Sequence, residues 1–503
     1  MGTQRALHRV KERLEWLLDE CGLYAVVNAG PDIHLLILSR VNRMLSFGAT
    51  ALVLALYLNE LGFSDEWTGL LFSLTLLGDV VLSLLMTMAA DHFGRRRTLV
   101  LTSALAILSS VVFAISGNYY ILLLAAILGV ISPSGTEIGP DRAIEESIIA
   151  QLAEENRRTD LYTWYNTLSM LGAALGIAVS GLMVGFVREK LGGTAIQAYR
   201  SIFWLNAILA FIKAILALLL SKRCERPAED CTPASTSENG IIAESPTREI
   251  DETEPLLQQV GRTSEPCNGP DLPQVELQPK NHWSRLWPFS KDSTLTILLL
   301  CGLFSLDSFA SGLVPYSLIN LYLERKFSIP EKTLGGIMSG SLLLCVPFNL
   351  LAPAIAKRIG NVKTMVFGHL PAAVLLSLVP APSSPFLTFA IIYARQSVNS
   401  MDQAPRSAFV SAVVLPEERT AVMGLSNVLK TFSQSFGPGI SGVLAGRKLF
   451  WVAFVLAGAL KALYDVGLLA MFEYAKLHNR KKAYNGAIPD EEVSVETSRQ
   501  EEA

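Results

Sequence analysis

Two short stretches of the sequence bring carboxylates, a proline and an arginine together inside long apolar segments. Residues 137–142 read E-I-G-P-D-R, and residues 402–406 read D-Q-A-P-R. The carboxylates can take up a proton or contact a cationic group, while the arginines can keep a carboxylate ionised or bind an anion. Each proline removes one intrahelical hydrogen bond, which bends a helix and exposes a carbonyl oxygen. We predict that these stretches supply five residues of a substrate and proton pathway: Glu137, Asp141, Arg142, Asp402 and Arg406.

A structural salt-bridge network near the helix ends is the alternative, and it applies most to residues 141–146. Ionisable side chains inside a membrane are costly and are therefore functional candidates, unless they reach the interface. We expect Lys213 and Lys461 to reach it, and Arg40 and Arg43 can do the same at the start of the first span. Weaker candidates for the pathway are Asp79, Asp307, Arg395 and Asn399.

The elements that must position these residues are membrane-spanning helices. Of the 503 residues, 50% are hydrophobic and 17% are charged. The charges are concentrated between apolar segments of about 20 residues each, which is the length that crosses a bilayer as a helix. The sequence predicts twelve spans, at residues 36–58, 67–90, 98–117, 120–148, 161–187, 201–221, 294–323, 333–356, 363–381, 386–413, 421–445 and 450–472. The predicted class is an all-α, multi-pass membrane protein.

The second six spans repeat the first six. The tripeptide L-Y-L at 56–58 recurs at 321–323. Residues 158–181 share seven residues with 419–442 at a constant spacing of 261, among them an arginine, an asparagine and two glycines. Six spans duplicated head to tail predict two pseudo-symmetric six-helix bundles that can rock about a shared site at the membrane midplane.

The turn between the second and third spans carries a distinctive motif. Residues 88–100 read M-A-A-D-H-F-G-R-R-R-T-L-V. The turn resembles the signature loop G-x-L-A-D-R-x-G-R-R of the major facilitator superfamily, and four residues are in register: Asp91, Gly94, Arg95 and Arg96. Three positions differ from that pattern, namely Thr87, Ala89 and His92. With the repeat, this resemblance implies the twelve-helix fold of that superfamily, and it implies that the four matching residues form a cytoplasmic gating loop.

The resemblance also implies a function. It indicates a secondary active transporter that carries a small-molecule substrate by alternating access, and the acids inside the spans favour protons as the coupling ion. A multidrug or metabolite efflux antiporter is one alternative, although the fifth span lacks the proline of the G-P-x-x-G-G pattern that such proteins often show. An alternative of another class is a transporter-like receptor or sorting protein that carries no solute. The ionisable residues inside the spans argue against that interpretation.

Other classes of protein are not indicated. The net charge of −3 gives no basic bias toward nucleic acid. The six cysteines are scattered, with no C-x-x-C pair that would suggest a disulfide or zinc framework. Because there is no P-loop, no dinucleotide-binding fingerprint, no H-E-x-x-H and no nucleophile elbow, we expect no enzyme activity, no cofactor and no metal.

The distribution of basic residues predicts the topology. Lysine and arginine are enriched in the loops on one side, whereas the loops at 59–66, 117–120 and 382–385 have neither residue, so both termini should face the cytoplasm. The expected domains are an amphipathic cytoplasmic segment at 1–35, a first bundle at 36–222, a disordered cytoplasmic linker at 223–292, a second bundle at 293–472 and a cytoplasmic tail at 473–503.

The linker holds a candidate sorting signal. Residues 252–257 read E-T-E-P-L-L, and Glu252, Leu256 and Leu257 resemble an acidic dileucine sorting signal, although so short a pattern can arise by chance. A sorting adaptor is therefore a candidate partner. The protein is expected in the plasma membrane or in a vacuolar or lysosomal membrane.

Replacement of both leucines tests this signal. If an adaptor reads the motif, L256A together with L257A should move the protein from a vacuolar or lysosomal membrane to the cell surface. Fluorescence microscopy of a tagged chain measures the redistribution. The control is a variant with alanine at Ile241 and at Val275, two aliphatic residues of the same linker that lie outside the motif. An unchanged distribution of the double variant would leave the motif a chance match.

Overall fold

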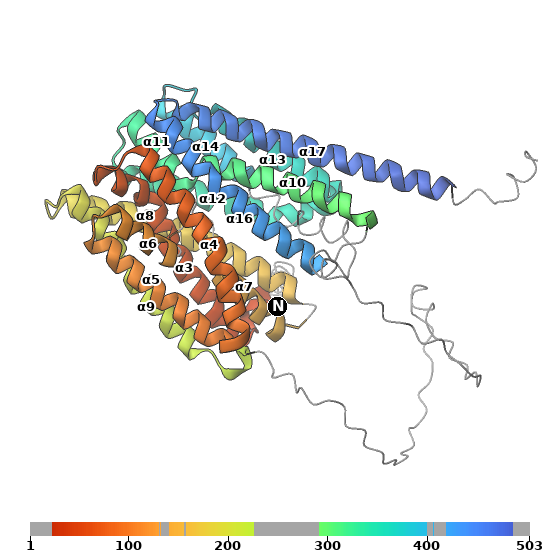
Figure 1. Ribbon diagram of the computed structural model, residues 1–503, viewed down its shortest axis with the longest axis horizontal. Coiled ribbons are helices and arrows are strands. Elements are labelled where there is room, and N and C mark those ends of the chain that lie inside the picture. The colour runs from red at the N-terminus through yellow and green to blue at the C-terminus, as the bar shows by residue number, and fades with distance from the viewer. Residues whose placement is uncertain are drawn as a thin grey trace, which may run out of the picture. The chain divides into compact units, whose positions relative to one another are not determined.

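The computed structural model describes residues 23–129, 131, 140–154, 157–225, 291–399, 406 and 419–485. The regular structure in these ranges is helical, and Figure 1 shows the helices running side by side. The first half of the chain supplies α2 (Leu23–Val27), α3 (Pro31–Glu60), α4 (Asp65–Phe93), α5 (Arg95–Ile115), α6 (Tyr119–Gly129), α7 (Pro140–Leu152), α8 (Arg158–Glu189), α9 (Ala195–Leu219) and the 3-10 helix η2 (Lys222–Cys224). The second half supplies α10 (Lys291–Leu313), α11 (Tyr316–Phe327), α12 (Glu331–Ile359), α13 (Asn361–Leu378), α14 (Pro385–Asn399), α16 (Arg419–Gly446) and α17 (Phe450–Asn485).

The helices follow the predicted spans. Each of the twelve predicted spans contains one or two helices of the described chain. The fourth span contributes α6 and α7, and the seventh is interrupted at residues 314–315 between α10 and α11. Seven helical segments of the described residues are long and apolar enough to cross a membrane, and α6 and α13 provide shorter apolar segments. The predicted amphipathic segment lies mostly outside the described residues, as does the linker.

Local sequence explains where several helices begin. Pro31 occupies the first turn of α3, where a missing N–H costs nothing, and the Ser64 side chain accepts a hydrogen bond from the Trp67 N–H at the start of α4. The turn after α4 and the turn after α12 both pass through a glycine with positive φ, Gly94 at 95° and Gly360 at 93°. Glycine adopts this conformation without the steric cost of a side chain, so both halves reverse direction in the same way.

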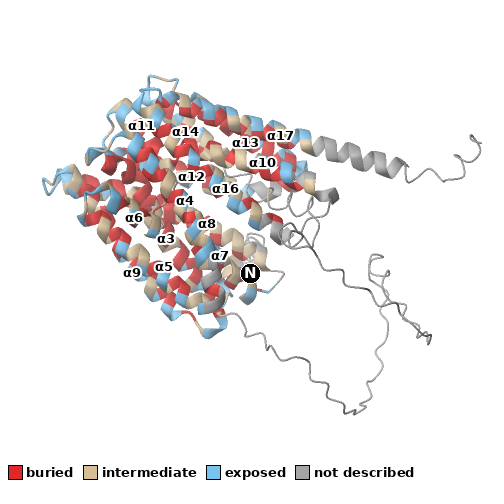
Figure 2. Cartoon of the chain, in the orientation of Figure 1, coloured by how far each residue is buried: buried red, intermediate tan, exposed pale blue. Residues whose placement is uncertain are grey.

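Large apolar side chains lie both inside the bundle and on its outer faces. Tyr57, Phe72 and Phe203 are fully buried, whereas Phe211 and Leu218 of α9 are more than half exposed. Figure 2 shows exposed positions along the outer helices and buried positions between them. In a bilayer the exposed apolar side chains contact lipid, so this pattern suits a protein with lipid as its solvent.

Pairs of facing glycines mark where the two halves cross. A Cβ added at Gly442 of α16 would lie 2.4 Å from the Asp65 carbonyl oxygen and 2.9 Å from the Cα of Gly69 in α4. At the second crossing, a Cβ added at Gly335 of α12 would lie 2.9 Å from the Cα of Gly181 in α8. Small residues let two membrane helices approach closely. Because Gly181 and Gly442 are related by the spacing of 261, the two crossings are pseudo-symmetric copies.

Substitution at one crossing should loosen it. Gly442→Ala places a methyl group against the α4 backbone, which cannot move aside cheaply, so we expect a destabilisation of about 1–3 kcal/mol and a lower Tm. Gly424→Ala on the same helix is the matched control, since no described atom lies within 4 Å of its added Cβ. Thermal unfolding of the two purified variants measures the difference. Equal Tm values would contradict the close approach of α4 and α16.

Candidate functional site

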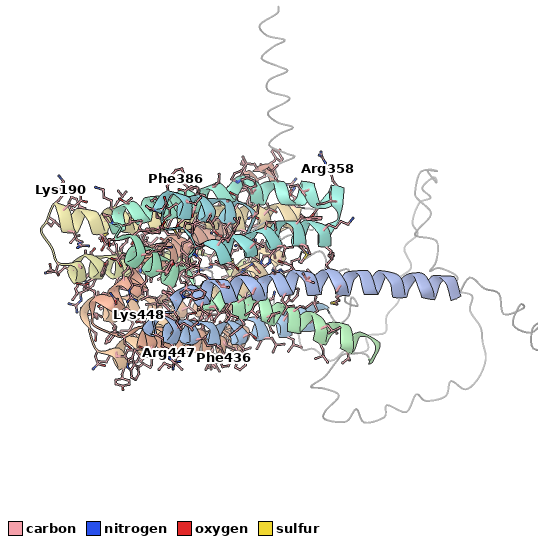
Figure 3. The ribbon with its side chains drawn as sticks, turned by 90° about the horizontal axis from the view of Figure 1, so that it is seen from above. Lys190, Arg358, Phe386, Phe436, Arg447 and Lys448 are labelled. Carbon is pink, nitrogen blue, oxygen red and sulfur yellow. The ribbon has the colours of Figure 1, made fainter. Side chains whose placement is uncertain are left out.

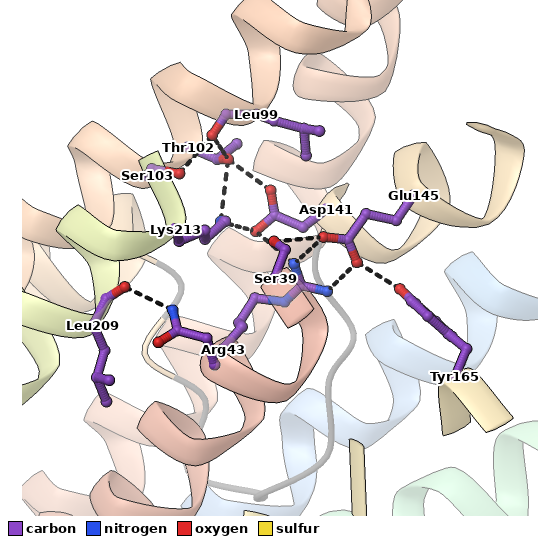
Figure 4. Close-up of polar contacts among 11 residues, drawn as sticks. Ser39, Arg43, Leu99, Thr102, Ser103, Asp141, Glu145, Tyr165, Leu209 and Lys213 are labelled. Carbon is purple, nitrogen blue, oxygen red and sulfur yellow. Dashed lines mark hydrogen bonds and ion pairs between the residues drawn. The ribbon is translucent and has the colours of Figure 1, made fainter. Parts of the chain in front are cut away.

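The first half contains a buried ion pair between its last helix and α7. The Lys213 ammonium lies 2.5 Å from Asp141 Oδ2, and both residues are less than 10% exposed. The Thr102 hydroxyl of α5 donates to the other Asp141 oxygen at 2.6 Å. Three helices therefore meet at one carboxylate, as Figure 4 shows.

A second carboxylate of α7 lies beside this pair. Two guanidinium nitrogens of Arg43 donate to the two oxygens of Glu145, each at 2.7 Å. The Tyr165 hydroxyl of α8 and the Ser39 hydroxyl of α3 also donate to Glu145, at 2.5 Å and 3.1 Å. Arg43 Nη1 is 3.9 Å from Asp141, which joins the two pairs into one group. We call Arg43, Asp141, Glu145 and Lys213 the N cluster (Figure 4).

The second half contains a comparable group around Asp307 of α10. Lys461 of α17 donates to Asp307 Oδ1 at 2.7 Å, and Arg406 donates to Asp307 Oδ2 at 3.2 Å. His369 of α13 is 3.5 Å from Asp307 Oδ1 on one side and 3.0 Å from Asp465 of α17 on the other. We call these five residues the C cluster.

The two clusters exchange an acid and an arginine between equivalent spans. A spacing of 265 relates Asp141 to Arg406, and it relates Asn42, the neighbour of Arg43, to Asp307. In the first half the acid comes from the fourth span and the arginine from the first. In the second half the acid comes from the seventh span and the arginine from the tenth. The last helix supplies a lysine in both halves.

A cavity lined by both apolar and polar side chains adjoins the N cluster. Its volume is about 60 Å³, and its walls include Asn42, Thr50, Asp141, Asn206 and Lys213. The Asn206 amide donates to Thr50 at 2.6 Å, while its buried Oδ1 has no hydrogen-bond partner within the described residues. The cavity has room for a few water molecules, and that oxygen can accept a hydrogen bond from one of them.

The structure brings three of the predicted pathway residues into the clusters, namely Asp141, Arg406 and Asp307. Arg142 lies apart, since its Nε pairs with Glu146 at 2.7 Å and its side chain is 42% exposed, which matches the structural salt-bridge alternative for this pair. Glu137 and Asp402 lie outside the described residues.

Three weaker candidates also stay outside the clusters. Asp79 accepts a hydrogen bond from Ser83 at 3.2 Å, and Arg395 donates to Gln396 at 3.4 Å. Asn399 is the last residue of α14 and is partly buried.

The prediction that Lys213 and Lys461 reach the interface is wrong. The two lysines are 4% and 5% exposed, and each ammonium is bonded to an aspartate. Arg43, at 6% exposure, is likewise buried against Glu145. An aspartate on a neighbouring helix provides a nearer counter-charge than the headgroups, so neither lysine needs to extend to the interface.

Sequence reasoning did not select His369 or Asp465. A signal was available, because both are ionisable residues inside the predicted spans 363–381 and 450–472. Their proximity could not be inferred, since they lie on different helices and 96 residues apart.

Ion pairs join the halves at one end of the bundle, which we call the distal end. Arg188 at the end of α8 pairs with Glu331 at the start of α12 at 2.6 Å, and Tyr199 donates to the same carboxylate at 2.7 Å. Arg325 of α11 pairs with Asp65 of α4 at 2.8 Å. These contacts hold the first and second halves together at the distal end.

Figure 3 shows Lys190 and Lys448 at the distal end and Arg358 at the opposite end. Basic side chains therefore occur at both ends. The orientation in the membrane remains a prediction from the loops.

The predicted gating loop lies at the end opposite the distal end. The Glu225 carboxylate accepts hydrogen bonds from the backbone N–H groups of Arg95 at 2.7 Å and Arg96 at 3.3 Å, which caps the N-terminus of α5. The Arg95 side chain donates to Gln151 at 2.6 Å. The side chain of Asp91 and the sorting motif with Glu252, Leu256 and Leu257 lie outside the described residues.

Relatives of the chain are known from sequence and from structure. The family model described as the Major Facilitator Superfamily matches residues 36–319 and 300–494. The chain is 33% identical over 447 residues to the uncharacterized membrane protein YJR124C of Saccharomyces cerevisiae, and the match covers 88% of this chain and 94% of the yeast protein.

Two solved structures have a similar fold. The nucleoside transporter NupG superposes with a TM-score of 0.60 at 15% identity, covering 88% of this chain and all of that one. The D-xylose-proton symporter superposes with a TM-score of 0.61 at 15% identity, covering 87% of this chain and 97% of that one. At this identity the likeness concerns the fold alone. Since the family model spans both halves, the chain belongs to the major facilitator superfamily, a family of multi-pass membrane transporters and not of enzymes.

Proposed function

We propose that the protein is a proton-coupled secondary active transporter that carries a small solute by alternating access. The observation that supports this most is the pair of buried clusters, one in each half, in which a lysine of the last helix lies against an aspartate and an arginine is nearby. A rival role as a receptor or sorting protein without transport would not need such clusters in both halves.

The energetics of buried charge support a functional role for the clusters. A buried ion pair stabilises a protein little, or not at all, relative to apolar residues of the same volume, because both charges must be desolvated. Inside a membrane the cost is larger, so charges retained there commonly belong to ion or substrate pathways. The clusters are therefore candidates for the groups that bind or respond to a proton.

The contacts between the halves suit alternating access. Where α4 crosses α16 and α8 crosses α12, the facing residues are glycines. No side chains interlock there, so one backbone can move against the other. The arginines of the two distal ion pairs, Arg188 and Arg325, are partly exposed, so water can hydrate them at modest cost when the pairs break. This conformation, closed at the distal end, would alternate with one in which these pairs separate.

A variant that removes both members of an ion pair tests the function of the pair without leaving one charge buried and unpaired. Asp307→Asn alone leaves Lys461 buried without its nearest carboxylate, which we expect to cost about 3–5 kcal/mol. The double variant with Asp307→Asn and Lys461→Met removes one charge of each sign and leaves Asp465 and Arg406, so the cluster stays neutral. It should insert, and it should unfold nearer to the wild-type temperature than Asp307→Asn alone. We expect it to lose solute accumulation driven by a pH gradient while it keeps exchange without a gradient.

A solute for this assay comes from comparing the metabolites that vesicles take up with and without the protein. Glu154→Gln is a control that removes an exposed acid outside the clusters and outside the distal contacts. A double variant that folds and accumulates solute with the wild-type pH dependence would refute a coupling role for the C cluster. If no solute responds to the wild-type protein under any gradient, the receptor or sorting role gains support.

The acids next to the prolines are tested in the same vesicles. Glu137→Gln and Asp402→Asn should give a correctly inserted protein with reduced gradient-driven accumulation, because a neutral amide cannot take up the coupling proton. Glu146→Gln is the matched control, since this acid pairs with Arg142 near solvent. Wild-type pH dependence in both variants would move the coupling group elsewhere, with Asp79 and the clusters as the remaining candidates.

A further inference from the structure

The C cluster contains a histidine that lies between two carboxylates. We propose that His369 is the proton-binding group of the second half, and that a proton bound there weakens the hold of Lys461 and Arg406 on Asp307. This inference rests on the proposed proton coupling and assigns it to a particular site. The ligand is a proton and the receiving atom is His369 Nε2.

The geometry defines which ring nitrogen of His369 is available to bind the proton. His369 Nδ1 lies 3.0 Å from both oxygens of Asp465. An ionised carboxylate only accepts hydrogen bonds, so Nδ1 carries the hydrogen in the neutral ring. Nε2 then presents a lone pair toward Asp307 Oδ1 at 3.5 Å. A proton on Nε2 replaces this unfavourable contact between a lone pair and an anion with an ion pair.

The charges around His369 balance one another when its imidazole is neutral. Two carboxylates, Asp307 and Asp465, and two cations, Lys461 and Arg406, make the cluster neutral when the imidazole is neutral. Tyr464 of α17 contacts the His369 ring edge to face, with centroids 5.6 Å apart. Within the described residues, no charged group of α12 or α14 contacts the ring, although both helices pack against α13.

One more cation lies near the cluster without touching the histidine. Lys430 of α16 is over the Phe304 ring at 4.4 Å, and the Arg406 guanidinium is over the same ring at 5.4 Å. Arg395 of α14, the charged residue of that helix, donates to Gln396. Positive charge on these residues opposes a proton on His369, whereas the two carboxylates that flank the ring favour it.

Histidine suits this role better than the acids around it. Its ordinary titration falls between pH 5 and 8, the range of physiological proton gradients. Asp307 is already engaged by two cations, at 2.7 Å and 3.2 Å. A bound metal ion is not indicated, because the described residues contain no group of three or more His, Cys, Asp or Glu side chains arranged to hold one.

Proton binding at His369 would change the contacts of several helices at once. The imidazolium competes with Lys461 of α17 and with Arg406, which follows α14, for Asp307 of α10. Arg406 also lies over the rings of Phe304 and Tyr464, at 5.4 Å and 5.5 Å. A change in one charge can thus alter how the seventh, tenth and twelfth spans contact one another.

Nitrogen-15 NMR of the histidine side chains tests the site without any substrate. The full chain, labelled at its six histidines, is placed in lipid nanodiscs and titrated from pH 5 to 8. His369→Gln identifies the resonance of His369, and His34→Gln, which removes an exposed histidine of α3, is the matched control. We expect the His369 resonance to change from neutral to protonated within this range.

Vesicle transport distinguishes failure of this inference from failure of the proposed function. His369→Gln should abolish the dependence of solute accumulation on the pH gradient, whereas His34→Gln should preserve it. A His369 ring that keeps one protonation state from pH 5 to 8, or a His369→Gln variant with wild-type pH dependence, would overturn the inference and leave proton coupling standing. Wild-type vesicles that show no gradient-driven solute movement would instead overturn the proposed function, whatever the ring does.

Discussion

A charged side chain inside a lipid-embedded bundle needs a counter-charge from another helix. The backbone groups of its own helix are already hydrogen-bonded to one another, and the lipid tails provide no polar partner. This constraint organises both halves of the protein. Asp141 is held by Lys213 of α9 and Thr102 of α5, and Asp307 is held by Lys461 of α17 and by Arg406. Each buried acid thereby fixes the positions of helices that are far apart in the sequence. A change in the protonation of one acid therefore alters the contacts among all of these helices.

The contacts between the halves follow a different rule. They combine close backbone approach at glycines with ion pairs at the distal end, such as Arg188 with Glu331. The carboxylates and lysines of the clusters within each half are buried, whereas the arginines that join the halves, Arg188 and Arg325, are partly exposed. Contacts within a half are therefore costly to break, and contacts between halves are cheap, which is the arrangement that rigid-body rocking of two bundles requires.

Much of the fold could be predicted from the sequence because hydropathy reports directly on the membrane. The twelve spans and the head-to-tail repeat follow from apolar length and from residues that recur at fixed spacing. The site was only partly predictable. Depth along a helix can be estimated from its ends, so Asp141, Asp307 and Arg406 could be placed inside the bilayer. Which neighbour a side chain meets depends on helix rotation and packing, and so the pairing of Lys213 with Asp141 was missed.

The exchanged charges of the two clusters constrain how this duplicated chain can change. After duplication, matching segments of the two halves could in principle recombine and homogenise. Here, copying α7 over the tenth span would set Asp141 in place of Arg406, opposite Asp307, and would leave two facing acids with one lysine between them. The reverse copy would bring a second arginine against Arg43 and Lys213. Each cluster therefore fits only the helices of its own half, and the corresponding spans of the two halves are not interchangeable.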